Sequence, residues 1–125
     1  MDINKQIEYW KSGAKSDIET AGILIDKGKY LHGLFFCHLT IEKILKANFV
    51  MQNKKVAPKT HDIIYLAEHA NLKLRENDLQ FLPILMKYQL EGRYPEYSPI
   101  IPPQENSNEY LNKTKDLLEW LIQRL

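Results

Sequence analysis

Three short polar segments carry the side chains that could do chemistry in this Leu- and Ile-rich sequence. They occupy residues 42–47, 59–62 and 93–96. The first contains a carboxylate and lysines, the second a lysine and an imidazole, and the third a guanidinium, a phenol and a carboxylate. Cations and an imidazole can bind phosphate, and an imidazole can also transfer protons near neutral pH. If the fold brings the segments together, they predict a site for phosphate, a nucleotide or an RNA strand.

The third segment contains the two side chains most suited to direct contact with such a ligand, Arg93 and Tyr94. A guanidinium forms bidentate hydrogen bonds with phosphate and carboxylate groups. An arginine at the end of a helix also has a purely structural explanation, because it complements the helix dipole. The chain is predicted to leave the helix at once, which would place both side chains at an accessible corner.

The first segment lies on a predicted helix, with Glu42 four residues before Lys46 and four after His38. This spacing is as typical of a weak surface ion pair as of a binding site. We interpret His38, which lies on the apolar face, as a hydrogen-bonded core histidine with Asp17 as a possible partner. Asp17 is either a solvated residue at the edge of the apolar stripe or a buried acid that needs a partner.

The second segment stands where a short helix begins. Thr60 is the predicted N-cap, and Asp62 complements the positive end of the helix dipole. The same free backbone donors, beside Lys59 and His61, could instead bind an anion. Both interpretations stay open. The ligand-binding candidates are therefore Glu42, Lys46, His61, Arg93 and Tyr94.

Apolar residues spaced three and four apart predict the helices that must position these groups. The first helix should end near Gly28, and the second should run over about residues 29–52. The apolar face of the second is broad enough to predict contact with several neighbours. Further along the chain, Pro83 predicts a kink or a late start in a fourth helix that Gly92 closes.

The last helix is predicted to begin at Asn106, since Glu109 three residues later completes a capping-box pattern. Residues 94–103 contain four prolines and should form an extended crossing loop. Two-residue alternation typical of strands is absent. We therefore predict an all-α fold, a single domain over residues 1–125 built as an up-and-down helical bundle of about four long helices plus one short helix.

Composition narrows the function. At 125 residues with a net charge of +1, the chain suits one domain and does not suit a dedicated DNA-binding domain. No apolar run reaches the roughly 18 residues of a membrane span, and the N-terminus lacks the apolar stretch of a signal peptide. The lone Cys37, predicted to be buried, fits a reducing cytoplasm. The four histidines lack the paired spacing of metal ligands, and no serine has the glycine-framed elbow of a nucleophile. The five glycines are scattered and form no phosphate-binding loop, so we predict neither a metal nor a cofactor.

Over nearly its whole length the sequence resembles the HEPN family (higher eukaryotes and prokaryotes nucleotide-binding domain). The resemblance rests on the order and spacing of short motifs in the four predicted helices. These are Ala14, Asp17, Ile18 and Ala21 in the first helix; Tyr30, Glu42, Lys43, Lys46 and Ala47 in the second; residues 59–62 at the start of the third; and residues 93–96 at the end of the fourth.

The resemblance implies a small helical bundle that is usually a homodimer. Such proteins are often encoded beside a minimal nucleotidyltransferase in prokaryotic toxin–antitoxin modules, or fused to one. Some members are metal-independent ribonucleases in which an arginine near a helix end, followed about a turn later by a histidine, acts across the dimer interface. Arg93 matches that arginine, but no histidine occurs on its C-terminal side.

We therefore expect a binding and interaction module rather than an enzyme: a cytoplasmic homodimer that binds a nucleotide, an RNA or a nucleotidyltransferase partner. The alternative is a metal-independent ribonuclease in which Arg93 stabilises the phosphorane and His61 or Tyr94 transfers protons. A third hypothesis is a purely structural subunit in which caps and surface ion pairs explain every polar segment.

Overall fold

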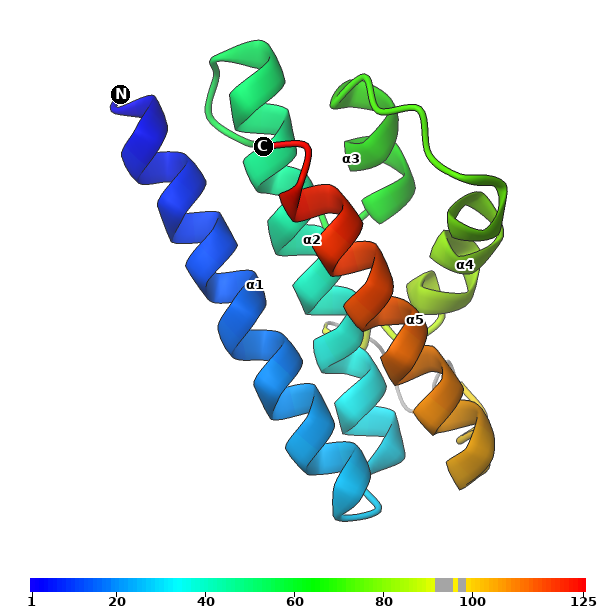
Figure 1. Ribbon diagram of the computed structural model, residues 1–125. Helices are drawn as coiled ribbons and strands as arrows, with labels where there is room; N and C mark the ends of the chain where they lie inside the picture. Colours follow the sequence, from blue (N-terminus) through cyan, green and yellow to red (C-terminus); the bar gives the residue numbers. More distant parts are fainter. Residues whose placement is uncertain (92–95, 97–98) are drawn as a thin grey trace.

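A computed structural model of the protein describes residues 1–91, 96 and 99–125. Across these residues it is all-helical, without a strand, which confirms the predicted fold class. Its five helices are α1 (Ile3–Asp26), α2 (Tyr30–Asn53), α3 (Ile63–His69), α4 (Glu76–Met86) and α5 (Gln104–Ile122) (Figure 1). With 11 residues, α4 is shorter than the long helix predicted there.

The three long helices α1, α2 and α5 run side by side, and α1 is antiparallel to the other two (Figure 1). Helices α3 and α4 lie on the side of the bundle opposite α1, and both chain termini lie at one end. Helix α2 contacts all four other helices, as its broad apolar face predicted. Its fully buried side chains, including Leu34, Ile41, Ile44 and Leu45, form the centre of the core.

Glycines set the turn and the close packing between α1 and α2. As predicted, α1 ends just before Gly28, whose φ of 79° lies in the left-handed region that favours glycine. At the start of α2, a Cβ on Gly33 would lie 2.5 Å from Cγ1 of Ile25. Gly33 therefore allows the two helices to meet closely.

The start of α3 differs from the prediction. Its N-cap is Asp62, not Thr60: Oδ1 of Asp62 accepts hydrogen bonds from the backbone N–H groups of Ile64 and Tyr65, each at 3.0 Å. The hydroxyl of Thr60 instead accepts from the N–H of Asp62 at 3.1 Å. A carboxylate at the N-cap also complements the helix dipole. Asp62 therefore both caps the helix and interacts with its dipole, whereas the sequence analysis assigned the cap to Thr60.

The ends of α4 and α5 also correct the sequence analysis. Helix α4 begins at Glu76 and includes Pro83, so the late start is wrong, and it ends at Met86 rather than near Gly92. Helix α5 begins two residues before Asn106, and its N-cap is Pro103. The capping box is therefore wrong. Because a proline fixes φ and Pro103 has an extended ψ of 163°, its backbone sets the boundary without a side-chain cap.

None of the described helices is both long and apolar enough to cross a membrane.

Candidate functional site

Three predicted ligand-binding residues, Glu42, Lys46 and His61, meet at one carboxylate. Oε1 of Glu42 lies 2.9 Å from Nδ1 of His61, and Oε2 lies 3.1 Å from Nζ of Lys46. Glu42 and Lys46 are one turn apart on α2, whereas His61 comes from the segment between α2 and α3. We call these three residues the Glu42 cluster.

The surface ion pair considered for Glu42 and Lys46 is wrong, because both side chains are buried. The Glu42 side chain is 5% exposed and that of Lys46 is 8% exposed. The ammonium of Lys46 also lies 5.0 Å from the centre of the Trp10 ring on α1, a cation–π contact. A buried carboxylate requires charged or hydrogen-bonding partners, and Lys46 and His61 supply them to Glu42.

His38 supports the cluster from the core side. It is fully buried, as predicted for a core histidine, and its Nδ1 lies 3.8 Å from Oε1 of Glu42. His38, Glu42 and Lys46 thus form a polar line along one flank of α2. The four-residue spacing predicted the line, but only the packing shows that it faces inward.

His61 is the exposed member of the Glu42 cluster, with 46% of its side chain accessible. Since a carboxylate accepts hydrogen bonds, the contact with Glu42 assigns the proton to Nδ1 of His61. The other ring nitrogen, Nε2, faces Oε2 of Glu91 at 3.5 Å, and the Glu91 side chain is itself 64% exposed. The carboxylate of Glu42 therefore orients a half-exposed imidazole whose Nε2 faces Glu91.

Arg93 and Tyr94, the other two predicted site residues, lie outside the described residues. The fourth helix, which the sequence analysis extended to this segment, ends at Met86. In the sequence Arg93 follows Glu91 by two residues. Sequence reasoning missed Glu91 and Trp10 as neighbours of the cluster, since neither stands in a motif and only the fold brings them there.

Asp17 proves to be a buried acid with a partner, which decides between its two interpretations. Its Oδ2 lies 2.7 Å from Nζ of Lys43, and the Asp17 side chain is 11% exposed. The stem of Lys43 crosses α1 at Gly13, where an added Cβ would lie 3.0 Å from Cδ of that lysine. A second charged pair is therefore held between α1 and α2.

The predicted anion site at the start of α3 has lost two of its backbone donors to Asp62. The capping interpretation of this segment is therefore the better one. Among residues 1–91, 96 and 99–125, no group of three or more His, Cys, Asp or Glu side chains could hold a metal ion. Cys37 is buried as predicted, and burial raises the pKa of its thiol from 9.0 to about 12.

Comparisons with known proteins agree with the fold. The sequence model of the protein family described as HEPN domain matches residues 7–125. The crystal structure of TT1696 from Thermus thermophilus is similar with a TM-score of 0.81, covering 96% of this chain and 98% of that chain. Its sequence is 20% identical, so the likeness shows the fold alone. A search of curated proteins found no match.

Proposed function

The chain belongs to the HEPN domain family, and we propose that it is a single-domain nucleotide- or RNA-binding module whose ligand contacts Nε2 of His61. One observation carries the proposal: the 2.9 Å contact between Oε1 of Glu42 and Nδ1 of His61. It holds an exposed imidazole in one orientation by means of a buried carboxylate. An imidazole held in this way can donate to a phosphate oxygen when it is protonated, or act as a base when it is neutral.

The surroundings of His61 suit an anionic ligand. The connector between α2 and α3 carries the exposed residues Lys54, Lys55 and Lys59 shortly before His61 in the sequence. Exposed lysines attract phosphate groups through a long-range, salt-dependent interaction. The opposing charge is Glu91, which a ligand phosphate would have to displace from Nε2 of His61.

Within this proposal Glu42 and Lys46 are positioning residues and do not touch the ligand. Both side chains are more than nine-tenths buried, and each already satisfies the other. We keep Arg93 and Tyr94 as proposed ligand contacts. The supporting fact is that Glu91 reaches the cluster and precedes Arg93 by two residues, a length of chain that spans at most about 7 Å.

Calorimetric titration with a panel of nucleotides and short RNA oligomers tests the proposal. His61→Ala and Arg93→Ala should each weaken binding by at least about tenfold, which corresponds to roughly 1.4 kcal/mol for a charge-assisted contact. His69→Ala is the matched control, because His69 is an exposed histidine on α3 whose ring contacts Tyr65. Binding that survives both substitutions, or no binding at all, would leave the Glu42 cluster with a structural role.

The oriented imidazole also favours a second candidate, a metal-independent ribonuclease. Nε2 of His61 would take the proton of the RNA 2′-hydroxyl as that oxygen attacks the phosphorus, and Arg93 would stabilise the phosphorane. As the bond to the 5′-oxygen breaks, the imidazolium, stabilised by Glu42, would return the proton to that oxygen and leave a 2′,3′-cyclic phosphate. Labelled RNA incubated with the protein in EDTA provides the test. Cleavage that disappears in His61→Ala and Arg93→Ala but persists in His69→Ala would establish an enzyme, and intact RNA would exclude it.

The assembly proposed with this function is a cytoplasmic homodimer that partners a nucleotidyltransferase in a toxin–antitoxin type system. Its support is membership of the HEPN domain family. Sedimentation equilibrium measures the mass of the free protein, for which 14.7 kDa is the monomer. Co-expression with the nucleotidyltransferase encoded next to it, if one is present, tests the partner. A monomer at all concentrations would contradict the dimer.

A further inference from the structure

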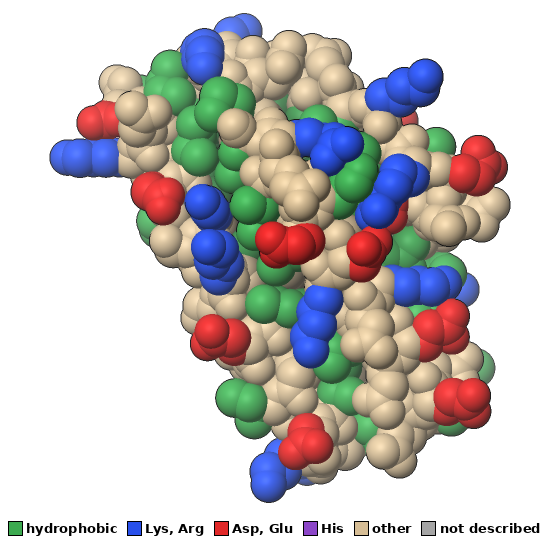
Figure 2. Space-filling view, viewed as in Figure 1, with side chains coloured by type: hydrophobic (Ala, Val, Ile, Leu, Met, Phe, Trp, Pro, Cys, Tyr) green, Lys and Arg blue, Asp and Glu red, His purple; other side chains and the backbone are tan. Residues whose placement is uncertain are grey.

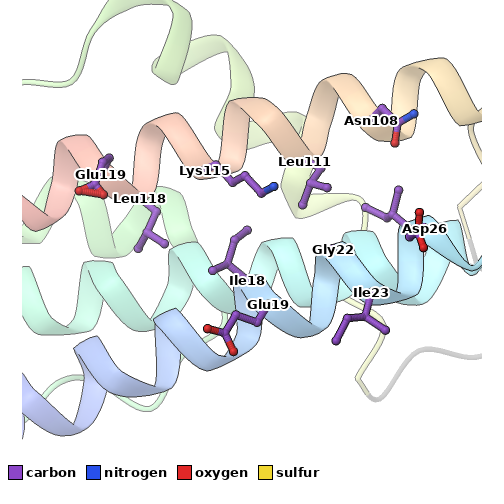
Figure 3. A pocket seen from close by; sticks show the side chains of 11 residues that line it. Ile18, Glu19, Gly22, Ile23, Asp26, Asn108, Leu111, Lys115, Leu118 and Glu119 are labelled. Carbon is purple, nitrogen blue, oxygen red and sulfur yellow. The ribbon is translucent and has the colours of Figure 1, made fainter.

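A groove of about 860 Å³ lies between α1 and α5 on a face that does not include the Glu42 cluster. Ile18 from α1 and Leu111 and Leu118 from α5 lie on its two sides (Figure 3). Ile23 also lines it and is 62% exposed. In the space-filling view, hydrophobic side chains continue along the line between these two helices (Figure 2).

The charges that line the groove are predominantly negative. They are the carboxylates of Glu19, Asp26 and Glu119 and the ammonium of Lys115, all exposed. None of the four forms an ion pair with any other residue in the part of the chain that the structure describes. The groove therefore combines apolar side chains with a net charge of −2 that this chain leaves unbalanced.

Contacts among the described residues do not explain the glycine at position 22, which lines the groove on α1. A glycine within a helix costs about 1 kcal/mol relative to alanine. A Cβ on Gly13 would meet Lys43 and one on Gly33 would meet Ile25, but a Cβ on Gly22 would meet nothing within 4 Å. A small residue on an open helix face allows another backbone to approach closely.

We infer that this groove is the docking site for a basic amphipathic helix of a partner protein. Apolar side chains of that helix, spaced three and four residues apart, would fill the groove against Leu111 and Leu118, and its backbone would pass over Gly22. Flanking lysines or arginines would face Glu19 and Glu119. Charge rules out the same groove of a second copy as the occupant, because two such faces would bring six carboxylates together against two lysines.

The first experiment measures binding of a designed helical peptide to the full chain by fluorescence anisotropy. The peptide carries leucines spaced three and four apart, with lysines on both flanks; a second peptide has every lysine replaced by glutamate. The cationic peptide should bind, and binding should weaken as salt concentration rises. The anionic peptide should bind at least tenfold more weakly. Equal binding of the two peptides, or no binding of the cationic one, overturns the inference.

Substitutions then place the peptide in the groove. Gly22→Leu puts a side chain where the helix should pass, so affinity should fall at least tenfold. Thermal stability should not fall, because the added Cβ meets nothing within 4 Å and leucine favours a helix more than glycine does. Glu19→Lys combined with Glu119→Lys should weaken binding and reduce its salt dependence. Glu8→Lys is the matched control, an exposed acid of α1 that does not line the groove. Affinity unchanged by Gly22→Leu overturns the inference.

A sedimentation measurement on the free protein separates a partner helix from a second copy. If Gly22→Leu converts a dimer into a monomer, a second copy occupies the groove and the inference is wrong. If the mass is the same with and without the substitution while peptide binding is lost, the partner helix is supported. Neither readout depends on nucleotide binding at His61, so this inference and the proposed function can fail separately.

Discussion

Helix α1 meets its two long neighbours in opposite ways. Against α2 it is closely packed: Gly33 removes the Cβ that would collide with Ile25, and the Asp17–Lys43 pair is held between the helices. Between α1 and α5 there is a groove, and a Cβ added to Gly22 there would meet no atom within 4 Å. One side of α1 is thus closely packed against the rest of the chain, and the other side borders an open groove.

The two sides of α1 differ in whether contacts within the chain account for their glycines and charges. On the α2 side every glycine in close contact has a steric reason and each buried charge has a countercharge. On the α5 side the glycine and the carboxylates have no such reason among the described residues. Substitutions on the two sides should therefore have opposite effects on stability.

The largest loss should come from the buried pair on α2. Lys46→Met leaves the Glu42 carboxylate without its ammonium partner and should lower the free energy of unfolding by about 3 kcal/mol, because breaking a buried ion pair typically costs 3–5 and His61 still donates. Urea denaturation measures it. Adding Glu42→Gln to Lys46→Met should recover part of the loss. A loss below about 0.5 kcal/mol would mean that the pair behaves as a surface pair.

Burial of Cys37, a residue of α2 that hydrogen-bonds with Thr114 of α5, should make stability depend on pH. Burial raises the pKa of Cys37 from 9.0 to about 12, so the folded state favours the neutral thiol. This contribution is complete below about pH 9 and is lost as pH rises toward 12; by about pH 10.5 the loss should be roughly 2 kcal/mol.

Cys37→Ala provides the control for that measurement. Burial also raises the pKa of Tyr88, so the native protein and the variant both lose stability at alkaline pH. Only the difference between their unfolding curves reports the thiol. The native protein should show the steeper decline between pH 9 and 12, and parallel declines would indicate that water reaches Cys37.

Alanine at two glycines tests the comparison directly. Gly33→Ala should destabilise the fold by about 1–2 kcal/mol, because its Cβ would lie 2.5 Å from Ile25 and overpacking typically costs 1–3. Gly22→Ala should stabilise it by about 0.5–1 kcal/mol, since only helix propensity changes. Thermal unfolding of both variants measures the pair. If both substitutions changed stability in the same direction, the distinction between the two sides of α1 would be wrong.

The smallest effect is expected at the rim of the groove. Glu119→Gln should change the free energy of unfolding by less than about 0.5 kcal/mol, because this exposed carboxylate has no ion-pair partner among the described residues. Asp17→Asn on the other side removes a partner at 2.7 Å from Lys43 and should cost more. Chemical denaturation of the two variants and the native protein in one buffer measures both changes in the free energy of unfolding.

Much of the fold could be predicted because its signals are local. The spacing of apolar residues indicated the helices, Gly28 marked the end of α1, and the broad face of α2 predicted its central place. Helix starts were harder to predict. Either Thr60 or Asp62 could cap α3, and Pro103 sets the start of α5 without a side-chain hydrogen bond. The motifs from Ala14 to Glu96, taken in order, identified the family.

The candidate site depended on contacts between segments far apart in the sequence. The four-residue spacing predicted that Glu42 and Lys46 would be neighbours, but an ion pair looks the same in sequence whether it is exposed or buried. Trp10 from α1 and His61 from the α2–α3 connector decide that question, and they reach the pair only through packing. Local chemistry in the sequence determined the helices and the family, whereas tertiary structure decided which charges are buried, because burial is a property of neighbours.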